Sequence, residues 1–196
     1  MKWVIEPQHS SVEFSAKHMI FSTVRGSFKQ FEVDIDLDDS NLENSRVEAR
    51  IDVASLDTNQ EMRKQHLLSP DFLDVQNYPE ITFKSTKISK TGEGEYDMTG
   101  DLTIRGTTRP VTLQLEGGQA KDPYGNLRWA FTAETTINRK DWGLAWNVAL
   151  ETGGVMVGEK IKIELAVELI TQEAFQAMMA AFQKRATEAA EKAAQS

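Results

Sequence analysis

The residues best suited to chemistry lie close together, where residues 58–71 carry Arg63, His66 and Asp71. Arginine and histidine both donate hydrogen bonds to oxygen anions, so this pair suits a phosphate or a similar head of a ligand. Asp71 would repel such a group, and its expected role is a hydrogen bond that pins the segment to the rest of the fold. For Arg63 both interpretations, ligand contact and internal hydrogen-bond partner, stay open.

Metal binding and hydrolysis receive less support from the sequence. His9 and His18 are nine residues apart, about 30 Å along one strand, so they cannot share an ion. His18 and His66 are better interpreted as core or rim side chains. Ser10, His66 and Asp71 could form a triad on paper, but the sequence has no G-x-S-x-G motif and no cysteine. We therefore expect no metal, no cofactor and no enzyme, with a hydrolase using His66 as the weakest alternative.

These residues must be positioned by an unusual segment, because residues 55–83 break the pattern of the rest of the chain. Thr58 can cap a short helix, with Glu61 at its third position completing a capping box. The helix should end at Ser69, because a residue before proline is pushed out of the helical region. The segment therefore predicts a helical excursion at about 58–68 that covers one mouth of a barrel.

Nearly all of the remaining chain before Gln172 alternates apolar and polar residues, which indicates strands with one buried and one wet face. About eight strands are predicted, including long ones at 11–21 and 24–37, the second with a bulge or bend that Gly26 is well placed to allow. Several exceed the usual length of about five or six residues, which favours a barrel over a sandwich. The expected fold is all-β, an elongated eight-stranded antiparallel barrel with room for packed side chains or one slender ligand.

The inward-facing positions supply most of the candidate ligand contacts. Small residues such as Ala49 share these rows with aromatic ones, which fits either a cavity or an interior filled by its own side chains. Trp142 lies in an irregular stretch, where it either packs on the barrel end or gates a mouth. The candidate ligand-binding residues are Phe14, His18, Phe31, Val33, Ala49, Arg63, His66, Leu67, Phe72, Phe83, Met98, Leu102, Trp129, Phe131 and Trp142.

The period changes at the C-terminal end, where Phe175, Met178, Met179 and Phe182 follow one another at helical spacing. This predicts an amphipathic helix that begins at a cap by Thr171. The chain thus divides into a barrel domain, 1–170, and a C-terminal amphipathic helix, 171–196. An apolar stripe of this size must be covered, and we expect a homodimer to cover it, with a lid over the barrel's own mouth as the alternative.

The formal net charge is −8, all of it on residues 1–170. That charge argues against nucleic acid and against electrostatic docking on anionic headgroups. The N-terminus has no apolar run of the kind that signal peptides carry, and no stretch reaches the roughly 18 apolar residues of a membrane helix. The expected location is cytoplasmic as written, or periplasmic if a signal was removed.

From Trp3 to about Ile170 the chain resembles the YceI-like family. The shared motifs, in order, are His9-Ser10, Gly26-x-Phe28, Ser55-Leu56-Asp57-Thr58, Arg63-x-x-His66-Leu67, Asp71-Phe72, Tyr78-Pro79-x-Ile81-x-Phe83, Gly100-Asp101-Leu102-Thr103-Ile104-Arg105-Gly106, Arg109-Pro110-Val111 and Ile137-Asn138-Arg139-x-Asp141-Trp142-Gly143. The resemblance implies a lipocalin-like barrel whose cavity binds a polyisoprenoid chain, in a family that is often secreted to the periplasm and has no established enzymes. The chain departs from it at Lys64, where the family usually has an acid, and by the helix after Thr171.

Residues and resemblance together predict a protein that binds, carries or stores a long-chain isoprenoid lipid inside the barrel, without catalysis. The polar residues near 55–80 would hold the head of that lipid. The alternative is a structural or interaction module with a self-filled barrel that dimerises through its C-terminal helix.

Overall fold

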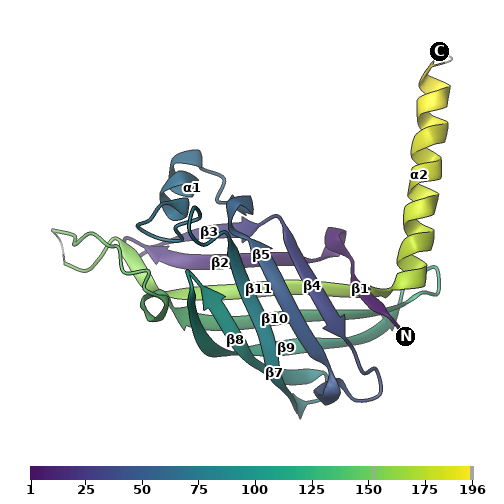
Figure 1. Ribbon diagram of the computed structural model, residues 1–196, viewed down its shortest axis with the longest axis horizontal. Coiled ribbons are helices and arrows are strands. Elements are labelled where there is room, and N and C mark those ends of the chain that lie inside the picture. Colours follow the sequence, from purple (N-terminus) through teal and green to yellow (C-terminus); the bar gives the residue numbers. More distant parts are fainter. Residues whose placement is uncertain (152, 195–196) are drawn as a thin grey trace.

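The computed structural model describes residues 1–151 and 153–194, which form one curled antiparallel sheet and two α-helices (Figure 1). The strands are β1 (Trp3–Ile5), β2 (Ser11–His18), β3 (Ser22–Phe28), β4 (Phe31–Asp36), β5 (Arg46–Asp52), β6 (Leu56–Asp57), β7 (Glu80–Gly92), β8 (Glu95–Ile104), β9 (Thr107–Lys121), β10 (Leu127–Asn138) and β11 (Val157–Thr171). The helices are α1 (Glu61–Leu68) and α2 (Gln172–Ala194), with short 3-10 helices η1 (Pro7–His9), η2 (Leu42–Asn44), η3 (Val53–Ser55) and η4 (Arg139–Trp142). Neither α-helix is long and apolar enough, over its described residues, to cross a membrane.

The sheet runs in the order β4-β5-β7-β8-β9-β10-β11-β2-β3-β6, with β1 added beside β11. Among the described residues no strand pairing joins β4 to β2 or β3, so the sheet curls into a half-barrel that strand pairing does not close. The mostly β, lipocalin-like architecture is confirmed, whereas the predicted count of eight strands is wrong. Two very short strands, β1 and β6, add to the count, and the predicted strand 24–37 divides into β3 and β4.

The division falls at Lys29 and Gln30, where the backbone leaves the ladder and bonds instead to the segment around η3. The N–H of Lys29 donates to the carbonyl of Ser55 at 3.2 Å, and the N–H of Asp52 donates to that of Gln30 at 3.0 Å. Gly26, expected at a bulge, lies within β3 directly opposite Phe14. A Cβ atom there would come within 2.4 Å of Phe14 Cζ, so the glycine makes room for the ring.

The predicted strand 11–21 also ends early, at His18, because Met19 and Ile20 both have left-handed backbone conformations, with φ of 49° and 69°. The chain reverses there and turns Ile20 outward, although alternation predicted it to point in. The Ile20 side chain is 54% exposed as a result.

Helix α1 begins at Glu61, and its cap is Gln60 rather than Thr58, so the predicted start at 58 is wrong. The side-chain oxygen of Gln60 accepts a hydrogen bond from the N–H of Arg63. The preceding residue, Asn59, has φ of 55°, which turns the chain into the helix and leaves Thr58 buried.

Helix α2 begins as expected, with Thr171 Oγ1 accepting a hydrogen bond from the N–H of Ala174 at 3.2 Å. The helix then points away from the sheet, at the end opposite α1 (Figure 1). Phe175 and Met178 are half-buried near its base, whereas Phe182 is 65% exposed. A lid over the barrel's own mouth is therefore not what this helix forms.

Candidate ligand-binding cavity

A cavity of about 430 Å³ lies inside the curled sheet. Its wall runs from Leu37 and Leu42, near the base of α2, to His18 and Met156 at the end where α1 lies. The wall is overwhelmingly apolar, because the period-two alternation places one row of hydrophobic side chains from each long strand on the concave face. The interior is thus not filled by the protein's own side chains, and its volume falls within the range of small-molecule pockets.

The structure brings most of the candidate residues to this cavity. The residues that line it are Phe14, His18, Phe31, Val33, Ala49, Arg63, His66, Leu67, Phe72, Phe83, Met98, Leu102, Phe131 and Trp142. Trp129 lies outside the lining, because it packs in a separate core cluster with Trp3, Leu42 and Leu169. Its ring stacks on that of Phe131, with centroids 5.6 Å apart, so it packs beside a wall residue on the same face of β10.

The two walls of the cavity differ in how tightly they are packed. On β7 and β8 the inward side chains of Phe83, Met98 and Leu102 are all buried. On β2, β4 and β5 the inward side chains of Phe14, Val33 and Ala49 are only half-buried. Apolar side chains left partly uncovered inside a fold gain stability when an apolar ligand covers them.

The basic groups of the described lining gather at the α1 end: Lys17, His18, Arg63, His66 and Arg139. Lys17 and Arg63 are exposed as well as lining the cavity, so the wall reaches the surface at this end. The cavity is therefore a long apolar space with positive groups at one end.

His66 and Asp71 form a hydrogen bond, with Nε2 and Oδ2 3.0 Å apart, but this bond lies within the segment 58–71 and does not tie it to the rest of the fold. The ring of His66 also meets the edges of Trp146 and Phe72, at centroid distances of 4.5 and 5.1 Å. His66 is thereby fixed between a carboxylate and two aromatic rings. Arg63 donates from Nη1 to the carbonyl of Thr58 at 3.2 Å and makes no ion pair within the described residues, so it has N–H groups to spare for a ligand.

Arg139 is one of the cavity residues that the sequence reasoning missed, and it is only 3% exposed. Its guanidinium donates to three backbone carbonyl oxygens, those of Leu144, Val157 and Gly158. Burial lowers the pKa of Arg139, while the nearby charge of Glu159 raises it. Arg139 belongs to the sequence motif that ends in Trp142-Gly143, so a signal was present. The carbonyls to which Arg139 donates, however, lie up to 19 residues further along the chain.

Trp142 packs on the barrel end, since it is buried and its Nε1 donates to the carbonyl of Leu102 at 3.1 Å. Gly143 follows with φ of 76°, a conformation that lets its N–H close the short helix η4. The α1 end is thus held by hydrogen bonds from the side chains of Trp142 and Arg139 to backbone carbonyls.

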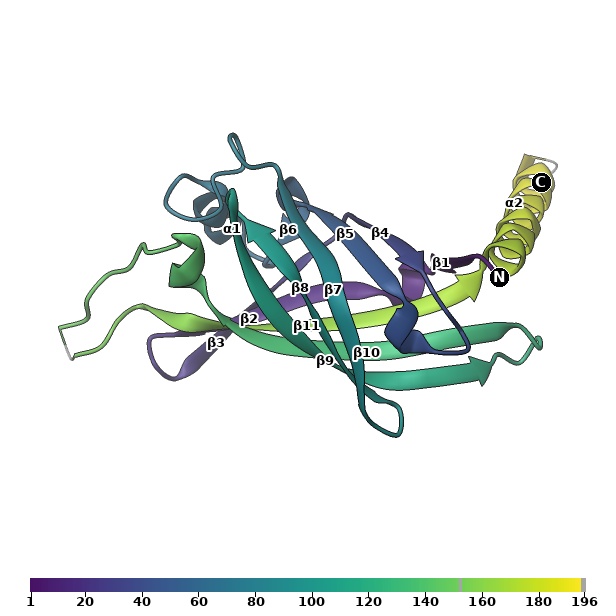
Figure 2. The same cartoon turned by 60° about the horizontal axis from the view of Figure 1, so that its bottom comes forward.

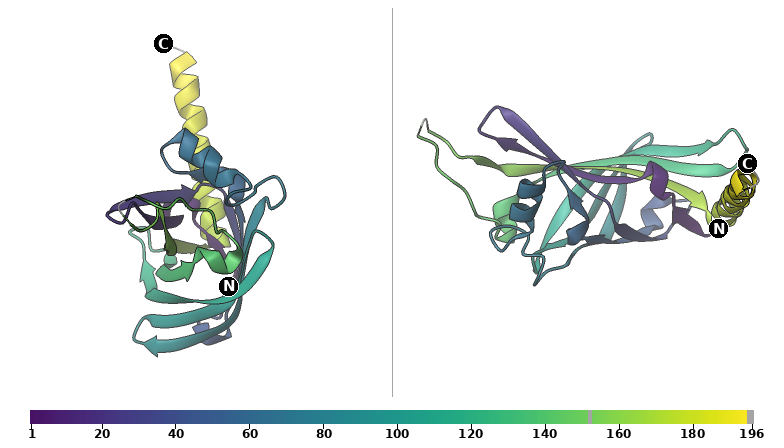
Figure 3. Two further views of the ribbon diagram at one scale, coloured as in Figure 1. Left: turned by 90° about the vertical axis from the view of Figure 1, so that its left-hand side faces the viewer. Right: turned by 90° about the horizontal axis from the view of Figure 1, so that it is seen from above.

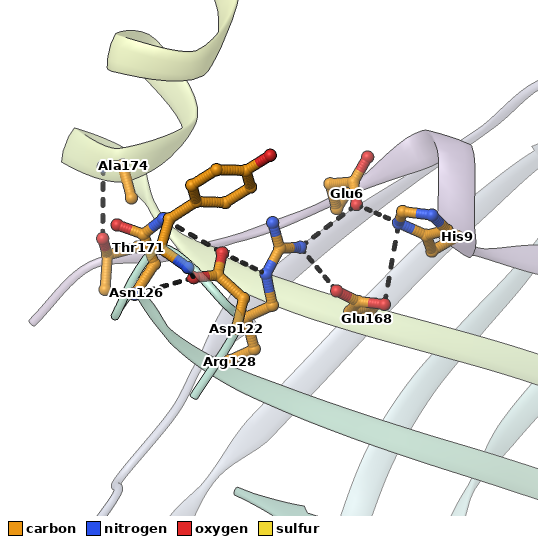
Figure 4. A network of polar contacts seen from close by, with 9 residues as sticks. Glu6, His9, Asp122, Asn126, Arg128, Glu168, Thr171 and Ala174 are labelled. Carbon is orange, nitrogen blue, oxygen red and sulfur yellow. Dashed lines mark hydrogen bonds and ion pairs between the residues drawn. The ribbon is translucent and has the colours of Figure 1, made fainter. Parts of the chain in front are cut away.

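The α2 end carries a different polar network, centred on Arg128 and outside the cavity lining (Figure 4). Arg128 Nη1 binds Glu6 Oε2 at 3.2 Å and also Glu168, and Nε binds Asp122 Oδ2 at 3.1 Å. Glu6 is 1% exposed, and its carboxylate also contacts His9. Glu6, His9 and Glu168 have ligand atoms close enough to hold a metal ion. Arg128 already balances both carboxylates, and the arrangement is that of an ion-pair network.

Ser10 does not meet His66 and Asp71, so the triad considered for hydrolysis is not assembled. Its Oγ accepts a hydrogen bond from the N–H of Glu168 at 3.0 Å, at the α2 end. The whole of β2 separates it from the α1 end, where His66 lies.

Several solved structures have a similar fold. BcnA of Burkholderia cenocepacia is similar with a TM-score of 0.72 and 25% identity, over 84% of this chain and 98% of that one. A Campylobacter jejuni YceI protein gives 0.69 and 30% identity, over 80% and 90%. A polyisoprenoid-binding domain from Saccharophagus degradans, implicated in plant cell wall breakdown, gives 0.65 over 86% and 98%, at 11% identity, a likeness of fold alone.

Sequence comparison is more specific. A UPF0312 protein of Pseudomonas putida strain W619 is 37% identical over 169 residues, which cover 86% of this chain and 84% of that protein. A UPF0312 protein of Pectobacterium carotovorum strain PC1 is 39% identical over the same length. A model of the YceI-like domain matches residues 3–169, and the chain therefore belongs to the YceI-like family.

Proposed function

We propose that this protein binds a long-chain isoprenoid lipid in its cavity, carries or stores it, and does no chemistry on it. The observation that carries the proposal is the shape and polarity of the cavity: one elongated apolar space with its basic groups at one end. An isoprenoid tail is apolar, slender and branched only by methyl groups, which suits the concave face of a sheet. Its burial is worth roughly 25 cal/mol per Å² of apolar surface removed from water.

In this arrangement the tail lies along the half-buried rows of β2, β4 and β5, and the head lies at the α1 end. Arg63 and His66 would contact the head, with the buried charge of Arg139 behind them. The Saccharophagus degradans domain of similar fold, described as polyisoprenoid-binding, supports this choice of ligand.

The test is to extract purified protein with organic solvent and identify prenyl lipids by mass spectrometry, in the wild type and in Ala49→Trp. Ala49 is half-buried and lines the cavity, so an indole there should fill the space and bring the lipid-to-protein ratio near zero. Ala54→Trp, on the exposed surface of η3, is the matched control and should keep its lipid. A folded Ala49→Trp protein with the same lipid-to-protein ratio as the wild type would contradict the proposal.

We further propose that the protein is a homodimer that pairs through the apolar stripe of α2. Helix α2 stands away from its own sheet, and Met179 and Phe182 are 40% and 65% exposed. A helix with such a stripe gains stability by pairing, and a two-fold arrangement is the commonest closed solution. Sedimentation velocity should show a dimer for the wild type and a monomer for Phe182→Lys. A wild-type monomer, or a Phe182→Lys protein that stays dimeric, contradicts this pairing.

A further inference from the structure

Two loops extend beyond the α1 end of the sheet (Figures 2 and 3). Both carry exposed apolar side chains. One is the turn between β2 and β3, where Met19, Ile20 and Phe21 are 51%, 54% and 87% exposed. The other is the segment before β11, where Val148 and Val155 are 41% and 40% exposed. We call these five residues the apolar lip.

Backbone contacts join the two loops into one surface. The N–H of Met19 donates to the carbonyl of Met156, and the N–H of Met156 donates to the carbonyl of Val148, at 2.8 and 2.9 Å. The side chain of Ile20 also reaches Gly154 in the second loop. The lip is therefore one edge that two separate parts of the chain build together.

The exposure of this edge is set by the backbone. Met19 and Ile20 both have positive φ, a conformation that is uncommon outside glycine and unfavourable for a β-branched residue such as Ile20. A regular strand would have turned Ile20 inward and buried it. The observed turn instead holds an isoleucine in water in a strained conformation, and such strain often accompanies function.

The charge on the β2–β3 side of the lip differs from that of the rest of the molecule, whereas the second loop carries the exposed Glu151. Residues 14–31 hold Lys17, Arg25 and Lys29 without any acidic residue, in a chain whose net charge is −8. Lys17 and Arg25 lie on the two strands just behind the turn, and both are exposed. Apolar tips backed by basic side chains are the pattern of a segment that enters the boundary between lipid headgroups and acyl chains.

The lip is also continuous with the cavity. His18, the residue before the turn, and Met156, which bonds to Met19, both line the cavity wall. A surface in contact with the lip would thus face the end of the cavity where its wall reaches solvent.

We propose that the apolar lip inserts into the surface of a lipid bilayer and places the basic end of the cavity against the membrane. This goes beyond lipid binding, because it names the surface at which the protein exchanges its ligand. A lipid could then enter tail first, without its tail crossing water. Because the chain is acidic overall, insertion of the apolar side chains, rather than net charge, has to supply the affinity.

Flotation with vesicles of phosphatidylcholine at physiological salt tests the proposal on the full chain. The wild type should float with the vesicles, and Phe21→Ser should reduce the bound fraction about tenfold or more, because a buried phenylalanine side chain carries that much transfer free energy. Tyr124→Ser is the matched control, since Tyr124 is 90% exposed in the turn between β9 and β10, at the α2 end. It should float like the wild type.

Three results would each overturn the proposal: a wild type that does not float, a Phe21→Ser protein that floats equally well, or a Tyr124→Ser protein that is impaired to the same degree. Loss of a dimer on Phe21→Ser substitution would assign the lip to contact between copies instead. Loading each variant with a polyprenol from detergent micelles separates this proposal from the proposed function. Phe21→Ser should still take up the polyprenol, whereas failure of the wild type to do so would count against lipid binding itself.

Discussion

Two arginines lie at the two ends of strand β10, and they have different kinds of hydrogen-bond partners. The difference indicates that one arginine stabilises the fold and that the other is available to a ligand. Arg128, at the α2 end, binds the carboxylates of Glu6, Asp122 and Glu168. Arg139, at the α1 end, binds the backbone carbonyls of Leu144, Val157 and Gly158. Both side chains are largely withdrawn from water, but only Arg139 lines the cavity.

The difference lies in how each charge is balanced. A guanidinium among carboxylates is neutralised, whereas carbonyl oxygens offer only partial charges and leave a net positive charge in place. Burial works against the charge of Arg128, but hydrogen bonds with Asp122 and Glu168 raise its pKa overall. Burial lowers the pKa of Arg139. The α2 end is therefore closed by a balanced network, whereas at the α1 end Arg139 has no carboxylate in ion-pair contact among the described residues and interacts with the charge of Glu159 at longer range.

The largest expected effect is a loss of folding stability when the Arg128 network at the α2 end is disrupted. Arg128→Met should lower the free energy of unfolding by about 3–5 kcal/mol, because it leaves the buried carboxylate of Glu6 without its cation. Urea denaturation followed by fluorescence measures the change. Arg50→Ala, on an exposed position of β5, is the control and should stay within about 0.5 kcal/mol of the wild type. A loss below about 1 kcal/mol for Arg128→Met would mean that the network is not a support.

The second effect concerns the α1 end. Arg139→Leu should cost about 2–3 kcal/mol, because the carbonyls of Leu144 and Gly158 lose the guanidinium donor, while that of Val157 keeps a bond from Asn147 Nδ2. Arg139→Lys should recover only part of this loss, since an ammonium group lacks the planar fork that reaches several acceptors at once. Urea unfolding of both variants decides the point. Equal stability of the leucine and lysine variants would show that shape, not hydrogen bonding, holds this end.

The sequence predicted correctly which side chains form the walls of the cavity, but it did not predict the structure at the two ends of the cavity. Alternation alone placed Phe83 and Met98 inward, because a strand has only two faces. It failed for Ile20, whose direction depends on two positive φ angles that no apolar pattern reveals. It also failed for Trp129, which faces the interior but is covered there by a second cluster that includes Trp3.

Strands β1 and β6 and the role of Arg139 could not be predicted from the sequence, for a common reason. Strands β1 and β6 have three and two residues, too few for any period to show. The role of Arg139 depends on carbonyls that belong to no particular residue type, so only the folded backbone identifies it. The family motif marked the position without stating its partners.

The third prediction concerns the contact between Arg63 and the head of the ligand. If the head of the lipid lies at the positive end, Arg63→Ala should weaken a prenyl diphosphate about tenfold and the matching prenyl alcohol much less. Arg46→Ala, at the start of β5 and likewise exposed, should leave both affinities unchanged. Displacement of a fluorescent lipid measures both affinities for the wild type and for each variant. Equal losses for diphosphate and alcohol would rule out a contact between Arg63 and phosphate.

The smallest expected effect is a pH dependence of the folding stability that Asp122 contributes at the α2 end. Hydrogen bonds from the Asn126 side chain, the backbone N–H of Asn126, Arg128 and the backbone of Tyr124 lower the pKa of Asp122 from 3.8 to about 2. A carboxyl group with a lowered pKa in the folded protein stabilises the fold above its unfolded pKa, and this contribution fades as the pH falls from about 4 to about 2.

Asp122→Asn should therefore be less stable than the wild type at pH 6, and the difference should shrink steadily between pH 4 and pH 2. Asp38→Asn is a useful reference, because hydrogen bonds from Ser40 and Asn44 lower the pKa of Asp38 to about 2 without any arginine. Since only the Asp122 bonds include a cation, 1 M salt should reduce the Asp122 difference more than the Asp38 difference. Urea midpoints across this pH range, at low and high salt, supply the measurement. A difference between wild type and Asp122→Asn that is the same at pH 6 and pH 2 would show that the carboxylate charge adds nothing to the Arg128 network.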